Sequence, residues 1–389
     1  MVINAYRTYT LETKIEKKLS INQMVKEICN RLIVNNSKLI ETKNILAINK
    51  LLEPIIINDY NIVNKQEIDN IIKQILDKIY GYGILEKYIR DGVTSDIRVV
   101  KYNMIYIKQN GNWKQVKDFF DSSEELNEYI RFCAVKNGNN INFETPVVVF
   151  SDRKNGLRIE AGIEPVNISD SSLVIRIHRK NVPSNLEKLF LQYNMLDRDS
   201  YSLLKDIMKE RKNVILCGKG GSGKTTLLRA LINELPKELA INTNEETAEL
   251  YLSGRNVIQR ECILTRNDGK NIDLEKLSRH ALVMSNDAII IGELKGKEAN
   301  TFFDAISTGH LGLATIHSDS SRNVIDRIIT LIKKDAKAAH YTEDFLRRFL
   351  SSSIQYIVYM NEYKVKDILS VKYNENIHKL EFKEIYVRS

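Results

Sequence analysis

Residues 213–231 read NVILCGKGGSGKTTLLRAL, an apolar run followed by a glycine-rich stretch and then by an amphipathic segment. The glycine-rich part, GKGGSGKTT at 218–226, has the spacing GxxxxGK[ST]. This spacing predicts a strand, a tight loop whose consecutive N–H groups face a phosphate, and a helix whose positive end points at the same phosphate. The stretch therefore indicates a nucleotide-binding α/β domain.

The residue types of the loop suggest individual roles. Lys224 can reach the outer phosphates of ATP, Thr225 can offer its hydroxyl to Mg²⁺, and Thr226 extends the helix cap. The other candidates for phosphate binding are Gly218, Gly220, Gly221, Ser222 and Gly223. The alternative, a glycine-rich turn that binds no nucleotide, becomes less credible if a strand precedes the loop and a helix follows it.

Short apolar runs and amphipathic segments alternate beyond residue 186, which predicts strands and helices in turn. Examples are ELAIN at 238–242, AIIIG at 288–292 and GLATIH at 312–317, with KEANTFFDAIS at 297–307 between the last two. This alternation is typical of a mostly parallel sheet with helices on both faces. Ligands of such sheets bind at the carboxyl ends of the strands.

Two carboxylates follow predicted strands and are candidates for catalysis. Glu293 comes directly after the most hydrophobic strand, and Glu245 lies in NEETAEL after ELAIN, with Glu246 next to it. A carboxylate at such a position can reach Mg²⁺ through water or accept a proton from an attacking water. A plain surface acid is the alternative for each of the three.

The stretch STGHLGLATIHSDS at 307–320 holds His310 and His317. No third ligand is spaced to join them in a metal site, which argues against metal binding. A core or structural histidine remains an alternative. We expect GLATIH to lie beside the strand that precedes Glu293, so that His317, together with His310, senses the γ-phosphate.

The chain before the nucleotide-binding domain predicts two further parts. Residues 1–80 form a helical segment, with apolar residues three and four apart, and residues 81–180 form an α+β domain. Asn110-Gly111 predicts a hairpin turn in the second part. Residues 181–185 are the expected linker to a domain at 186–389 that ends in a helical and strand extension.

Composition restricts the class of protein. No apolar run approaches the roughly 18 residues of a membrane span, and the N-terminus lacks a signal peptide, so we expect a cytoplasmic protein. The four cysteines form no CxxC pair, which argues against a disulfide framework or a cysteine zinc site. The net charge of +8 is dispersed along the chain, which argues against a nucleic-acid track.

Four of these segments, in this order, resemble the secretion ATPases of type II and type IV systems. The likeness covers roughly residues 80–350 and is nearest to the CpaF/TadA-type motors of Tad (Flp) pilus assembly. The segments that correspond to the phosphate loop, acidic box, Walker B and histidine box of that family are CGKGGSGKTTLLRAL, NEETAEL, AIIIGELKGKEA and TGHLGLATIHSDS.

The resemblance implies a hexameric ring of subunits, each with a RecA-like ATPase domain covered by an N-terminal domain. By that likeness Glu293 and Glu245 manage Mg²⁺ and the attacking water, and arginines from the N-terminal side approach the γ-phosphate. The matching arginines are Arg158, Arg176 and Arg179. The family also implies inner-membrane platform proteins as partners, with the ATPase peripheral at the inner face of the cytoplasmic membrane.

The sequence lacks two arginines that the family usually has near the Walker B segment. The region before that segment reads VMSNDAI, and Lys295 stands shortly after Glu293 where arginine is usual. Lysine lacks the planar fork of arginine, so a bidentate contact is lost there. The missing arginines leave open a nucleotide-gated scaffold with little hydrolysis. A ring ATPase that translocates nucleic acid is a second alternative to a secretion motor, because RecA-like rings also pull DNA.

Overall fold

The computed structural model describes residues 20–178, 184–264 and 271–388. These residues form two compact units, which fall within residues 1–94 and 103–121 and within residues 95–102 and 122–389. The predicted boundaries at 1–80, 81–180 and 186–389 stay a prediction. Most of the predicted linker, 181–185, lies outside the described residues.

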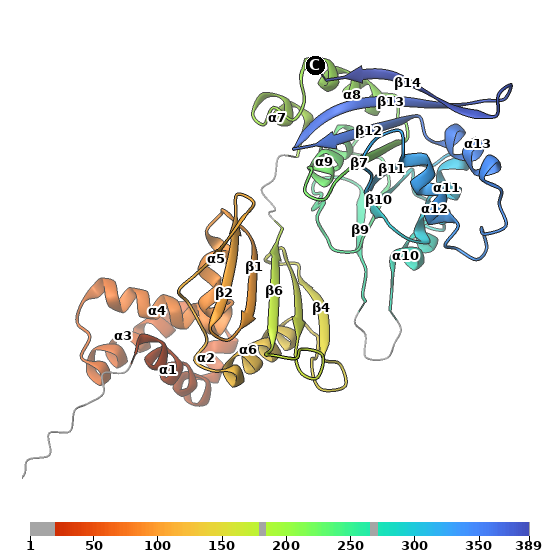
Figure 1. The fold of residues 1–389 in the computed structure, drawn as a ribbon. Helices are drawn as coiled ribbons and strands as arrows, with labels where there is room; N and C mark the ends of the chain where they lie inside the picture. The colour runs from red at the N-terminus through yellow and green to blue at the C-terminus, as the bar shows by residue number, and fades with distance from the viewer. Residues whose placement is uncertain (1–19, 179–183, 265–270, 389) are drawn as a thin grey trace, which may run out of the picture. The chain divides into compact units, whose positions relative to one another are not determined.

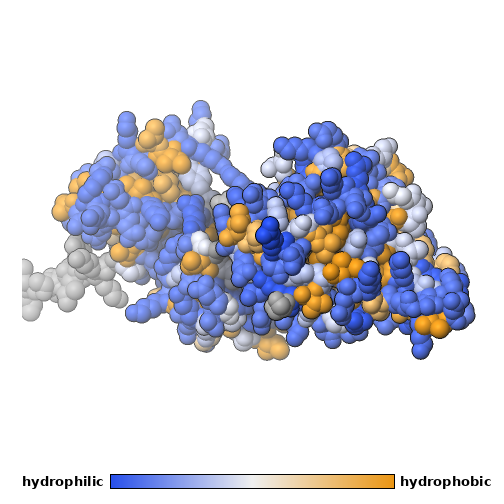
Figure 2. Space-filling view, turned by 90° about the horizontal axis from the view of Figure 1, so that it is seen from above, coloured by the Kyte–Doolittle hydropathy of each residue, from blue (hydrophilic) through white to orange (hydrophobic). Residues whose placement is uncertain are grey.

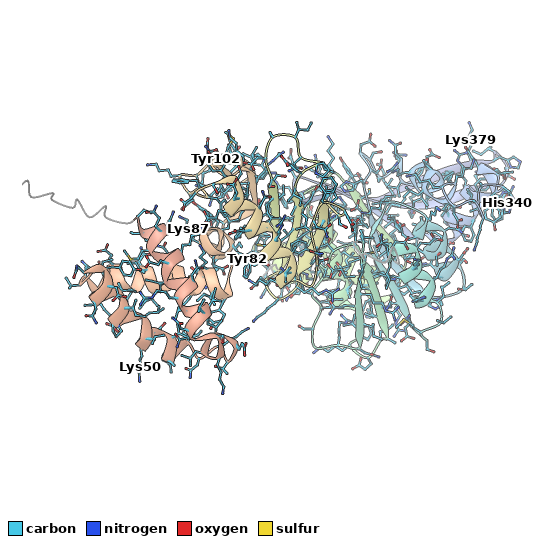
Figure 3. The ribbon with its side chains drawn as sticks, turned by 90° about the horizontal axis from the view of Figure 1, so that it is seen from below. Lys50, Tyr82, Lys87, Tyr102, His340 and Lys379 are labelled. Atoms are coloured by element: carbon cyan, nitrogen blue, oxygen red, sulfur yellow. The ribbon has the colours of Figure 1, made fainter. Side chains whose placement is uncertain are left out.

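The first unit is largely helical, as the three and four spacing of its apolar residues predicts. Ser20 caps the first helix, and the expected helical residues before it lie outside the described part of the chain. Ile68, Ile71 and Ile75 of the fourth helix are fully or almost fully buried against the first and third helices. Figure 3 shows Lys50 on the outer side of this bundle. The helices are α1 (Ile21–Asn35), α2 (Ser37–Glu41), α3 (Ile45–Tyr60), α4 (Lys65–Tyr80), the 3-10 helix η1 (Gly83–Leu85) and α5 (Glu86–Arg90).

The hairpin predicted at Asn110-Gly111 is confirmed. Strands β2 (Met104–Gln109) and β3 (Asn112–Gln115) pair antiparallel, with Gln109 opposite Asn112. The turn residues have φ values of 50° and 82°, the left-handed pair that a two-residue hairpin turn needs.

An antiparallel sheet and one helix begin the second unit. The strands β1 (Thr94–Lys101), β6 (Ser172–Ile177), β5 (Leu157–Gly162) and β4 (Val147–Asp152) follow one another in that order. Helix α6 (Ser123–Lys136) begins after Ser122, whose side chain accepts a hydrogen bond from the Glu125 N–H. The predicted α+β character is therefore confirmed.

The rest of the second unit is an eight-stranded, mostly parallel sheet, as the alternating pattern predicts. The strand order is β14-β13-β12-β7-β11-β10-β8-β9, and only the pairs of β13 with β12 and with β14 are antiparallel. The elements are α7 (Leu186–Leu191), α8 (Arg198–Lys209), β7 (Val214–Gly218), α9 (Lys224–Glu234), β8 (Ile241–Glu245), β9 (Val257–Glu261), α10 (Leu274–Ala281), β10 (Ala288–Leu294), α11 (Glu298–Ser307), β11 (Leu311–Ile316), α12 (Val324–Ile332), α13 (Glu343–Ser353), β12 (Tyr356–Asn361), β13 (Lys364–Asn374) and β14 (Lys379–Val387).

Two hydrophobic cores lie on the two faces of this sheet. Val214 and Leu216 of β7 pack into a core with α8 and α9, whereas Ile215 and Cys217 pack into a core with α11 and α12. Successive side chains of a strand point to opposite faces, which explains the division. Figure 1 shows β12, β7, β11 and β10 next to one another in this layer. Helices on both faces are therefore confirmed.

The described surface is mainly polar. Figure 2 shows hydrophilic residues over most of the visible face, with hydrophobic residues in separate patches. Among the described residues, no helix combines the length and the hydrophobicity that crossing a membrane would require.

Candidate functional site

The glycine-rich loop lies where the sequence predicts it, between β7 and α9. Gly218 ends β7 with a φ of 149°, and Gly223 precedes α9 with a φ of 95°. A methyl group on Gly218 would collide with the carbonyl oxygen of Met360 and lie 2.7 Å from Ser222 Oγ. The loop can therefore wrap this tightly only if residue 218 has no side chain.

Lys224 is the first residue of α9, and its side chain reaches back to the glycine-rich loop. It is only 7% exposed, and its Nζ donates to the carbonyl oxygens of Gly218 and Lys219, each at 2.9 Å. Burial lowers the pKa of Lys224, and the negative charge of Glu293 opposes that shift. The protein therefore keeps an ammonium group in a partly desolvated position beside the loop.

The loop has the properties of an anion cradle. The hydroxyl of Ser222 is buried and has no hydrogen-bond partner in the described structure. Helix α9 spans 11 residues and starts at the loop, so its first N–H groups and its positive end face the same place. Thr225 and Thr226 are half-buried in its first turn, whereas Gly220 and Gly221 are exposed at the tip of the loop. A phosphate chain fits this set of donors.

Glu293 and His317 meet beside the loop. The pairing of β10 with β11 is irregular between Ile291 and Leu294, which is where Glu293 lies. Such irregularities redirect side chains at the ends of strands. His317 follows β11, and its Nε2 is 3.0 Å from Glu293 Oε1. A methyl group on Gly220 would lie 3.5 Å from His317 Cε1, so the imidazole also borders the loop.

His310 lies at the other end of β11. Its Nδ1 is 3.0 Å from the carbonyl oxygen of Ala305, at the end of α11. The six residues of β11 separate it from His317, a span of roughly 20 Å at the usual rise of a strand. The expectation that β11 neighbours β10 is confirmed, but the structure does not bring His310 to the loop.

Glu245 is buried at the end of β8 rather than open to solvent. It is 3% exposed, and its Oε1 accepts hydrogen bonds from the N–H groups of Glu249 and Leu250 at 2.9 and 3.0 Å. Burial raises the pKa of Glu245 to about 8, against the lowering effect of these two hydrogen bonds. This geometry supports a structural role in fixing the segment after β8, and the catalytic role stays a prediction.

The two acids that follow Glu245 have basic partners. Glu246 pairs with Lys295, and the Arg158 Nη2 is 3.9 Å from its Oε2. The Oε1 of Glu249 is 3.3 Å from His178 Nδ1, an imidazole whose pKa is lowered by burial. Lys295 is the residue that departs from the family pattern, and here it contacts the acidic box.

Two of the three predicted arginines lie opposite each other on neighbouring strands, Arg158 on β5 and Arg176 on β6. Arg158 lies at Glu246, as described above, whereas Arg176 pairs with Asp96 at 3.2 Å. Arg179 lies outside the described residues. Their predicted approach to the γ-phosphate stays a prediction.

Sequence reasoning missed several charged residues around the acidic box. Arg229 of α9 is 5% exposed and donates to the Glu249 carbonyl oxygen. Glu261 pairs with Arg153 and accepts a hydrogen bond from Ser151 at 2.7 Å. These pairs join residues about 20 to 110 apart in the chain, so no local pattern could have indicated them.

The raised pKa of Glu245 predicts a pH-dependent stability. In the unfolded chain this carboxyl group has a pKa of about 4.3, so between about pH 4 and pH 8 the folded state binds a proton that the unfolded state has released. The free energy of unfolding therefore falls as the pH rises, by up to about 1.4 kcal/mol per pH unit from this group. Glu245→Gln keeps an acceptor for the two N–H groups but cannot ionise.

Urea denaturation of the wild type and of Glu245→Gln at pH 5, 6, 7 and 8 tests this expectation. The two proteins should have similar stability at pH 5, and the wild type should become progressively less stable than the variant toward pH 8. A difference between them that does not change with pH would show that Glu245 is ionised throughout.

The sequence of this chain is similar to those of several known proteins. Residues 147–360, more than half of the chain, match the family model described as type II/IV secretion system protein. The type IV secretion system protein VirB11 of Bartonella quintana is 31% identical over 166 residues, which are 42% of this chain and 46% of that protein. A putative conjugal transfer protein of Mycobacterium tuberculosis is 25% identical over 262 residues, 65% of this chain and 74% of that protein.

Among solved structures, the pilus retraction motor PilT with bound ADP matches with a TM-score of 0.53 and 22% identity, over 79% of this chain and 83% of that chain. This likeness shows a shared fold. The match to the VirB11 protein spans about half of that protein's length. The match over residues 147–360 contains the glycine-rich loop, Glu293 and His317, and the chain belongs to the type II/IV secretion system protein family.

Proposed function

We propose that this protein is an ATPase whose hydrolysis drives pilus assembly or protein secretion through a membrane platform. The observation that carries the proposal is the convergence of three side chains: Lys224, which reaches back to the glycine-rich loop, Glu293 near the carboxyl end of β10, and His317 after β11. A loop that cradles phosphates beside a carboxylate that can orient water has the parts that phosphoanhydride hydrolysis needs.

The loop residues bind the triphosphate of ATP. The N–H groups of the loop and of the first turn of α9 donate to its oxygens, and the Lys224 ammonium neutralises their charge. The Ser222 hydroxyl, which is buried without a partner in the described residues, gains an acceptor when a phosphate oxygen lies in the loop. Gly220 and Gly221, exposed at the tip, let the backbone approach the phosphates closely.

A magnesium ion would be held by Thr225 directly and by Glu293 through water, and it would neutralise charge on the outer phosphates. The described residues contain no cluster of three or more His, Cys, Asp or Glu side chains arranged around a metal position. Mg²⁺ keeps several waters and binds substrate phosphates, so it needs few ligands from the protein.

Glu293 and His317 act on the water that attacks the γ-phosphate. The Glu293 carboxylate is 38% exposed, so water can reach it, and it accepts a proton from that water as a general base. His317 Nε2, 3.0 Å from the same carboxylate, holds the carboxylate in position. Loss of the γ-phosphate changes the charge near His317, and the imidazole passes this change to the segment that leads to α12.

The residues around the acidic box connect this chemistry to the preceding sheet. Arg158, from β5, is bound to Glu246, and we propose that it moves to the γ-phosphate when the ring closes around ATP. Arg176 and Arg179 are further candidates for this role. Lys295, in place of the arginine that is usual in the family, supplies one charge to Glu246 without a bidentate contact.

We place the protein in the CpaF/TadA-type branch of the family, as a homo-hexamer that binds inner-membrane platform proteins. The order of the four sequence segments supports the branch, and the likeness to a type IV secretion system protein supports a role beside membrane components. The protein would then be cytoplasmic and peripheral at the inner face of the membrane. The helices within residues 1–80 are the proposed docking element for the platform.

Glu293→Gln tests the general base directly. The amide keeps the size of the side chain but cannot accept the proton, so turnover should fall about 10²- to 10⁴-fold. The dissociation constant for ATP should change by no more than about threefold, a smaller effect than the loss of one neutral hydrogen bond. Phosphate release and ATP binding are measured on the same preparations. Glu343→Gln, an exposed acid on α13, is the matched control and should behave as the wild type. A wild-type protein that binds ATP and releases no phosphate would favour the scaffold alternative.

His317→Ala separates the proposed response to the γ-phosphate from the binding of ATP. The substitution should leave ATP affinity unchanged and lower turnover about 10- to 100-fold, because Glu293 loses the partner that positions it. His340→Ala is the matched control, since Figure 3 and the exposure of this side chain place it on the surface at the end of the second unit where Lys379 lies. Equal turnover by the wild type and His317→Ala would remove the proposed role.

A further inference from the structure

A strained turn stands beside the glycine-rich loop. Glu362 and Tyr363 connect β12 to β13 as a two-residue hairpin turn, with φ values of 50° and 59°. Both positions of such a turn need left-handed backbone, which is why asparagine and glycine usually occupy them. Residues with larger side chains adopt that conformation at a cost in free energy. The protein therefore maintains an unfavourable pair of residues at this position, and such strain often accompanies function.

The register of the sheet brings this turn to the loop. β12 pairs parallel with β7, and Met360 lies opposite Gly218, so the turn starts just beyond the level at which the loop begins. A methyl group on Gly223 would lie 3.3 Å from the Tyr363 Cδ1 and 3.0 Å from the Met195 Cε. The Tyr363 ring therefore stands next to the start of α9, and it is nevertheless 63% exposed.

The strand order places different residues on the two sides of the glycine-rich loop. On one side of β7 lie β11 and then β10, which carry His317 and Glu293 at their ends; on the other side lies β12, which carries the turn. A triphosphate whose terminal phosphate lies at Glu293 must extend away from that flank toward its nucleoside. The nucleoside therefore emerges on the side of β12, where Tyr363 offers the face of an exposed aromatic ring.

We propose that Tyr363 binds the base of the nucleotide by stacking on it. This inference rests on the proposed function, because it requires a triphosphate oriented by Glu293 and Lys224. Each base has a π-face, so stacking strengthens binding of any nucleoside triphosphate without selecting strongly among bases. Met195, which also borders Gly223, supplies an apolar contact at the edge of the base.

Calorimetric titration with ATP and with inorganic tripolyphosphate, each with excess Mg²⁺, tests the proposal. Tripolyphosphate carries the phosphates and no base. Tyr363→Ala should weaken ATP binding about 5- to 100-fold, the range expected for one stacked base, and should leave tripolyphosphate binding unchanged. Tyr363→Phe keeps the ring and should bind ATP as the wild type does. Tyr341→Ala removes a ring that is 38% exposed on another segment and should change neither affinity.

The outcomes distinguish this inference from the proposed function. If the wild type binds both ligands and Tyr363→Ala retains the ratio of their affinities, the base-stacking role is wrong and the ATPase proposal stands. If Tyr363→Phe loses as much ATP affinity as Tyr363→Ala, the hydroxyl rather than the ring is responsible, and stacking is again excluded. A wild type that binds neither ligand contradicts both proposals.

Discussion

The pairing of β7 with β11 on one side and β12 on the other is the constraint on which the site depends. Cys217 lies opposite Ile316, and Gly218 opposite Met360. Because all these strands are parallel, the segments that follow them emerge at the same edge of the sheet. A slip of one residue in β7 would exchange the sides on which its buried residues pack and so expose a core to polar neighbours. The positions of the loop, His317 and the strained turn all follow from this register.

The carboxylates near the loop differ in their surroundings, and those surroundings suggest different tasks. Glu245 is buried and bound to backbone N–H groups, whereas Glu246 and Glu249 are paired with basic side chains. Glu293 is far more exposed than Glu245, and its partner His317 also borders the glycine-rich loop. A structural carboxylate is best satisfied by fixed donors, while a general base must remain accessible to its proton donor. This contrast favours Glu293 over Glu245 as the group that handles water.

Local sequence predicts the parts of this fold whose chemistry is local. The loop spacing, the alternation of strands and helices and the turn at Asn110-Gly111 each reflect short-range backbone requirements, and the structure has all three. The turn between β12 and β13 cannot be predicted in this way, because Glu362-Tyr363 lacks the residues that usually indicate a hairpin turn. His310 resembles a partner of His317 in the sequence, yet the length of β11 separates them. The pairs made by Arg229 and Glu261 depend on the folded sheet, so only the structure could show them.

The most direct test of the central claim is a crystal structure of the protein with Mg²⁺ and a non-hydrolysable ATP analogue. Our account predicts the terminal phosphate between the Lys224 ammonium and the Glu293 carboxylate, with the carboxylate close enough to reach it through one water, roughly 3–6 Å. A terminal phosphate on the β12 side of the loop, more than about 10 Å from Glu293 and so beyond the reach of one water, would contradict it.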